Sequence, residues 1–132
     1  MVSIDPQLQE NRAVHPRITY VEGQAQQEAT LRQVRELVGD APNALVILGS
    51  QPGTHIRMRE EFEAYHGFVP PGSYVIMENT VNNGHPVWPG FGPGPFEAVR
   101  QVLAEHGNFA VDPKMERFAL TFNPSGFLKR MR

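Results

Sequence analysis

The chain has 132 residues, of which 40% are hydrophobic and 20% charged, as in an ordinary folded domain. Its net charge of −2 argues against nucleic-acid binding, and its apolar runs fall short of the roughly 18 residues of a membrane span. The absence of cysteine excludes disulfides and thiolate chemistry and favours a cytoplasmic protein. We therefore expect a single cytoplasmic domain over residues 1–132.

Strands and helices alternate along most of the chain, and this order predicts an α/β fold with a mainly parallel sheet. Runs of β-branched, aromatic and aliphatic residues predict strands at residues 2–4, 17–21, 45–48 and 72–77. Apolar residues at helical spacing predict helices at residues 28–38, 57–65 and 95–107. The run at 45–48 is apolar throughout, which is typical of a parallel strand buried on both faces.

The C-terminal part departs from this alternation. Residues 109–111 and 118–122 are rich in aromatic and aliphatic side chains, and they predict an antiparallel pair that closes the sheet around Pro113. The final residues 128–132 carry three basic side chains, and we expect them to form a solvated end of the chain.

The strand at 72–77 runs into Glu78 and then into a long loop rich in proline and glycine. In open α/β sheets, ligands sit just beyond the carboxyl ends of the strands. Glu78 and the loop that follows it are therefore the predicted place for binding and chemistry.

Three motifs are specific in this chain: the run Asn82, Asn83, Gly84, His85 and Pro86, the loop at 91–95, and the stretch at 120–128. With these motifs the chain resembles the cephalosporin hydroxylase / rhamnosyl O-methyltransferase family, and the resemblance runs through most of residues 1–132. Family members are magnesium-assisted enzymes that use S-adenosylmethionine (SAM) and tailor sugars and antibiotics. The resemblance implies a Rossmann-like class I methyltransferase fold.

The SAM-binding part of the family pattern is incomplete in this chain. The family begins with a strand and a glycine-rich loop, and its second strand ends in an acid that holds the ribose. Here residues 2–4 match that second strand and Asp5 matches its acid, with no glycine-rich turn before them. We expect a fold that lacks the first strand and this loop, and an Asp5 that is structural.

The metal-binding acids of the family are also mostly replaced. The resemblance implies an aspartate after the strand at 45–48 and a Glu-Asp pair after the next strand. The turn at 49–55 contains no carboxylate, Glu78 is retained, and Asn79 stands in place of the aspartate. One carboxylate and one amide make a weak site for Mg²⁺, which prefers several oxygen ligands. We expect neither SAM nor magnesium as a cofactor.

Cofactor-free chemistry would then depend on the substrate side of the site. The candidates for proton transfer are Glu78, His55 and His85, because carboxylates and imidazoles are common acids and bases in enzymes. The candidates for metabolite binding are Asn79, Asn82, Asn83, Trp88 and Phe91.

Each catalytic candidate also has a structural interpretation. His55 can be an exposed residue at the start of a helix, and His85 can brace its loop by bonding to a backbone carbonyl. The carboxylate of Glu78 can fix the turn after its strand by accepting backbone N–H groups. Trp88 can cover the loop against the sheet instead of stacking on a ligand.

The leading hypothesis is a degenerate methyltransferase-fold protein of natural-product tailoring that binds a small polar or polyketide-like metabolite. It would catalyse a cofactor-free acid–base reaction such as cyclisation, isomerisation or elimination. One alternative is a non-catalytic subunit that assembles with a full-length homologue. Another is a residual SAM-dependent O-methyltransferase, particularly if the natural chain begins upstream.

The missing first strand also bears on assembly. In the family this strand lies in the middle of the sheet, so its loss exposes the inner edges of two half-sheets. Unpaired strand edges readily pair with other chains. We therefore expect a dimer or higher oligomer, or a complex with a homologue, and no nucleic-acid or membrane partner.

Overall fold

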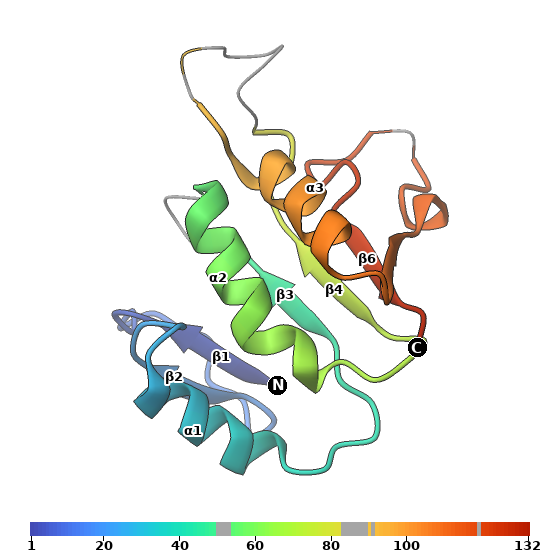
Figure 1. The fold of residues 1–132 in the computed structure, drawn as a ribbon. Coiled ribbons are helices and arrows are strands. Elements are labelled where there is room, and N and C mark those ends of the chain that lie inside the picture. Colours follow the sequence, from blue (N-terminus) through green and yellow to red (C-terminus); the bar gives the residue numbers. More distant parts are fainter. Residues whose placement is uncertain (50–53, 83–89, 91, 119) are drawn as a thin grey trace. The chain divides into compact units, whose positions relative to one another are not determined.

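The structure is a computed structural model that describes residues 1–49, 54–82, 90, 92–118 and 120–132. The chain divides into two compact units, Met1–Ala41 and Pro42–Arg132 (Figure 1). Both units combine strands and helices, which confirms the α/β class. Among the described residues, no helix has the length and apolar character that crossing a membrane requires.

The first unit contains β1 (Val2–Asp5), β2 (Thr19–Glu22) and α1 (Glu28–Val38), close to the predicted positions. β1 and β2 are parallel and form a two-stranded sheet. α1 packs on both strands and buries Leu31 and Val34. Gly39 ends α1 with a φ of 52°, a conformation that costs glycine little, so the predicted end of this helix is confirmed.

The second unit contains a four-stranded sheet in the order β3-β4-β6-β5. Its strands are β3 (Val46–Leu48), β4 (Tyr74–Met77), β5 (Phe109–Val111) and β6 (Phe127–Arg130). β3 and β4 are parallel, and β6 is antiparallel to both β4 and β5. α2 (His55–Tyr65) and α3 (Pro95–Glu105) contact each other and lie over one face of the sheet (Figure 1). The described part of this unit also contains the 3₁₀ turns η1 (His66–Phe68) and η3 (Pro113–Met115).

The core of the second unit lies between the sheet and these two helices. Val75 and Met77 of β4 are fully buried, whereas the alternate residues Tyr74 and Ile76 are partly exposed. This two-residue period means that one face of the sheet is covered and the other is more open. Phe62 of α2 is fully buried within this core.

Two expectations for the C-terminal part are wrong. The antiparallel partner of β5 is β6, and residues 118 and 120–122 are not in a strand. Phe118, Leu120 and Phe122 are all largely exposed, so these apolar side chains are not part of the core. The second wrong expectation is the solvated end at residues 128–132. Residues 127–130 form β6, and Leu128 is fully buried there between β4 and β5.

The expectation that residues 45–48 are buried on both faces is also wrong. Ile47 is 57% exposed and Leu45 is 54% exposed, whereas Leu48 is buried. Ile47 pairs in register with Ile76, which lies on the more open face of the sheet, and β3 is also at the end of the sheet, where it pairs only with β4 among the described residues.

Candidate site at the carboxyl ends of β3 and β4

The two parallel strands β3 and β4 end at the same edge of the sheet, which brings Gly49 and Glu78 together. The backbone N–H of Glu78 donates to the carbonyl of Leu48 over 2.8 Å, which continues the hydrogen bonding between β3 and β4 by one bond. The Glu78 carboxylate lies against Gly49, and a Cβ atom at that position would collide with Oε2. A residue with a side chain at position 49 would therefore displace Glu78 from this place.

The Glu78 side chain is half-buried, and its carboxylate has no hydrogen bond or ion pair with any described residue. No described residue donates a backbone N–H to this carboxylate, so the structural interpretation, in which it fixes the turn in this way, stays a prediction. A carboxylate at a strand end can accept a proton or a hydrogen bond from a ligand.

The turn that carries Glu78 is held by residues from the C-terminal part of the chain. The backbone N–H of Asn79 donates to Asn123 Oδ1 over 2.8 Å, and the buried Thr80 hydroxyl donates to the carbonyl of Pro124 over 2.7 Å. Asn79 has a φ of 58°, a conformation that asparagine tolerates better than most residues. The N–H of Asn82 donates to the Asn79 carbonyl over 2.9 Å and closes the turn.

Sequence reasoning missed Thr80 and Asn123 as positioning residues. A signal was present in the run Asn-Pro-Ser-Gly at 123–126, because these residue types favour turns whose side chains bond to backbone groups. The partner of that turn could not be inferred, because Asn79 and Asn123 are 44 positions apart.

No hydrogen bond or ion pair joins the described residue His55 to Glu78. His55 is the first residue of α2 and is partly exposed, and Thr54 caps this helix by accepting the N–H of Arg57 over 3.4 Å. His55 lines a groove of about 430 Å³, and Glu78 is not among the described lining residues. These lining residues are His55, Ile56, Arg59, Glu60, Glu63 and Gln101.

The predicted site residues therefore divide into three sets. Glu78, Asn79 and the exposed Asn82 share one turn at the carboxyl edge, while His55 lies in the groove beside α2. The remaining candidates lie outside the described residues; they are Asn83, His85, Trp88 and Phe91.

The described residues at this edge do not fit a magnesium site. Glu78 is the only carboxylate at the ends of β3 and β4, and residues 49–55 contain no acid in the sequence. A hard divalent cation needs several oxygen ligands, and the carboxylates among them supply the charge.

The described residues also match only part of the SAM-binding pattern of the family. Asp5 lies at the end of β1, and its Oδ1 accepts the N–H of Gln7 over 2.8 Å. This carboxylate oxygen therefore stabilises the local turn, as its structural interpretation predicts. Gly90, Gly92 and Gly94 precede α3, but they follow a long loop with prolines and not a strand, so they do not match the glycine-rich turn between strand and helix of a nucleotide site.

In the second unit, described groups with shifted pKa values include Tyr74, Asp112 and His66. The Tyr74 hydroxyl donates to Asp112 Oδ2 over 2.7 Å; this bond lowers the pKa of Asp112 and raises that of Tyr74. Burial lowers the pKa of His66, the nearby His106 lowers it further, and Glu63 acts in the opposite direction.

Comparisons with known proteins agree with this fold. The sequence pattern of the family described as Rhamnosyl O-methyltransferase/CmcI matches residues 1–131. The rhamnosyl O-methyltransferase of Mycobacterium tuberculosis (strain ATCC 25618 / H37Rv) is 31% identical over 117 residues, which are 87% of this chain and 48% of that protein. The corresponding protein of Mycobacterium leprae (strain TN) is 30% identical over 120 residues, or 89% and 52%. The chain thus spans about half the length of these curated relatives.

A solved structure is also similar. MycE, a methyltransferase from the mycinamycin biosynthetic pathway in complex with Mg and SAH, matches with a TM-score of 0.63 and 17% identity. The match covers 99% of this chain and 37% of MycE. At this identity the likeness supports the methyltransferase fold and carries no information about the ligand of this chain.

Proposed function

This chain belongs to the Rhamnosyl O-methyltransferase/CmcI family, and we propose that it binds a small metabolite at the carboxyl ends of β3 and β4 without SAM or magnesium. The metabolite is a polar or polyketide-like compound of natural-product tailoring. This class is suggested by the family name and by the pathway in which MycE acts.

The observation that supports this proposal is the Glu78 carboxylate at a strand end, which is unpaired among the described residues. It lies half-buried beside Gly49, in a turn held by Asn123, so its position is set before any ligand arrives. Glu78 can accept a proton from one atom of the metabolite and return it to another. This proton exchange needs no oxidant or reductant, because the proton that is removed is also returned, as in an isomerisation or cyclisation.

The other candidates have supporting roles in this proposal. The side-chain amides of Asn79 and Asn82 can donate hydrogen bonds to oxygens of the metabolite, since both lie in the same turn as Glu78. His55 and His85 are the candidates for a second proton donor. Asn83, Trp88 and Phe91 remain candidates for binding contacts in the loop that follows.

The first test is calorimetric titration of the purified chain with SAM and with its demethylated product, each with and without magnesium. We expect no heat of binding at millimolar ligand, because one carboxylate at the strand ends and an Asp5 that already bonds to Gln7 provide too few contacts. Micromolar binding of either compound would overturn the proposal and make methyl transfer the leading function.

The second test uses ligand-induced thermal shifts with a methyl rhamnoside and a macrolide aglycone as probes. We expect a shift with at least one of them, and Glu78→Gln should abolish it while the variant keeps its native circular dichroism. Glu10→Gln is the matched control, because Glu10 is exposed and lies in the other unit. An equal shift in the wild type and in Glu78→Gln would contradict a role for this carboxylate.

A second candidate function is that of a subunit that pairs with another chain, either a second copy or a full-length homologue. Two observations favour it. β3 has no partner on its outer side among the described residues, and Leu45 and Ile47 are both more than half exposed. An open edge next to exposed apolar side chains is a typical site for strand pairing.

Light scattering at micromolar concentration tests this assembly. We expect a dimer or higher oligomer, and Ile47→Lys should shift it toward monomer, because a charge on an edge strand opposes pairing. The substitution should not unfold the chain, since Ile47 is largely exposed. A wild-type protein that is purely monomeric would count against self-association, and co-purification with a larger homologue would then be the remaining test of this candidate.

A further inference from the structure

The ends of α2 and α3 bring together three side chains that are common metal ligands. α2 joins the parallel strands β3 and β4, so it ends near their amino ends, opposite the edge that carries Glu78. Glu63 lies in the last turn of α2, and His66 follows that helix directly. His106 follows the end of α3, which contacts α2.

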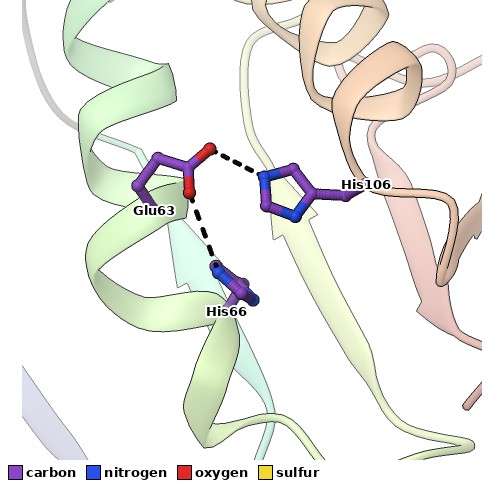
Figure 2. Close-up of side chains that lie close together, drawn as sticks. All are labelled: Glu63, His66 and His106. Atoms are coloured by element: carbon purple, nitrogen blue, oxygen red, sulfur yellow. Dashed lines mark hydrogen bonds and ion pairs between the residues drawn. The ribbon is translucent and has the colours of Figure 1, made fainter.

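The three side chains point toward one another (Figure 2). Glu63 Oε1 lies 2.7 Å from His106 Nε2, and Glu63 Oε2 lies 3.8 Å from His66 Nε2. One ligand atom from each residue falls within 4.8 Å of the other two. Around a tetrahedral zinc ion with bonds of about 2.0–2.1 Å, ligand atoms are roughly 3.3 Å apart, so small side-chain movements suffice.

The surroundings of the two histidines favour a cation and hold the rings in place. Both histidines cap the C-terminal ends of helices, where the helix dipole favours positive charge. The His66 ring stacks on the fully buried Phe62 with 5.1 Å between centroids, and His106 packs on the edge of Phe62. His66 Nδ1 is buried with no hydrogen-bond partner among the described residues. Packing against Phe62, and not a hydrogen bond at Nδ1, therefore sets the orientation of the His66 ring.

We propose that Glu63, His66 and His106 bind one zinc ion, which ties the end of α2 to the end of α3. Two imidazoles and one carboxylate are a ligand set that zinc accepts, and nitrogen ligands select against Mg²⁺ and Ca²⁺. The Glu63 side chain is 42% exposed, so an ion can enter from solvent, and water can fill the fourth position. This site lies at the opposite edge from Glu78 and is independent of the proposed function.

The test is calorimetric titration of Zn²⁺ into the chelator-treated chain after removal of any affinity tag. We expect binding of one ion per chain and no binding of Mg²⁺. His66→Ala and His106→Ala should each weaken zinc binding by at least roughly 100-fold, more than the loss of an outer-shell partner. His15→Ala is the matched control, because His15 is exposed and lies in the first unit.

Glu63→Gln provides a variant that preserves the size of the side chain. It should fold like the wild type and bind zinc more weakly, because the amide oxygen carries no charge. Zinc should also raise the melting temperature of the wild type and not that of His106→Ala, since an ion that binds only the native state stabilises it. A folded wild type that binds no zinc would overturn the proposal. Zinc binding that survives unchanged in both histidine variants would do the same.

Discussion

Replacing Asn123 by alanine should destabilise the turn that positions Glu78. In the native structure Asn123 Oδ1 accepts the backbone N–H of Asn79 over 2.8 Å in a half-buried place. The variant loses this bond, which is typically worth about 0.5–1.5 kcal/mol, and leaves a donor unsatisfied at a cost of about 1–3 kcal/mol. Because water can partly replace the lost acceptor at a half-buried position, we expect a total loss of about 1–2 kcal/mol.

Urea unfolding measures the global effect, and amide hydrogen exchange measures the local one. Exchange of the Asn79 amide should accelerate in Asn123→Ala, because its hydrogen bond is gone. Asn123→Asp keeps an acceptor oxygen and should restore most of the protection. Asn82→Ala is the matched control, since the Asn82 side chain is exposed, and surface substitutions usually stay within about 0.5 kcal/mol. The reasoning is refuted if Asn123→Ala loses no more stability than Asn82→Ala and the Asn79 amide exchanges unchanged.

Two further predictions concern packing and pH. Gly126→Ala should lose about 1–3 kcal/mol in urea unfolding, because the new Cβ would collide with the carbonyl of Met77, whereas the matched variant Gly107→Ala meets open space and should lose little. Tyr74→Phe should destabilise the chain near neutral pH and less so in acid. The Tyr74 bond lowers the pKa of Asp112, so its stabilisation is present above the ordinary pKa of 3.8 and disappears as the pH falls through the lowered value. Equal losses in urea unfolding at neutral and acid pH would contradict this coupling.

Local patterns predicted the helices well because each carries its own signals. α1 has apolar residues at helical spacing and a glycine at its end, and α3 begins at Pro95, a residue suited to the first turn. These features act within one or two turns of the chain. Their outcome therefore depends little on the tertiary structure around them.

The strand errors have a different cause, because strand burial depends on neighbours far away in the sequence. The segment at 118–122 and the segment at 127–130 both contain aromatic and aliphatic residues. Only the second has strands on both sides, and Leu128 is fully buried there. Likewise Ile47 looks like a core residue from its neighbours, but β3 lies at the end of its sheet.

The candidate site shows the same limit. Placing Glu78 at a strand end required only the rule for parallel sheets, and the structure agrees with it. The bond between Asn79 and Asn123 and the meeting of Glu63 with His106 join segments 44 and 43 positions apart. Neither contact leaves a pattern in the local sequence, so only the folded structure brings them together.

The site residues described here and the partners that hold them belong to one unit of the chain. Glu78, Asn79 and Asn123 all lie within Pro42–Arg132. Asp5, which the resemblance matches to the ribose-binding acid of the family, lies in the first unit. Its Oδ1 accepts a hydrogen bond from the backbone N–H of Gln7. In our proposal the ligand is bound by residues of the second unit alone, whereas SAM bound in the family manner would also use Asp5. Asp5→Asn consequently separates the two functions, because it should leave metabolite binding intact and should weaken SAM binding only if SAM binds.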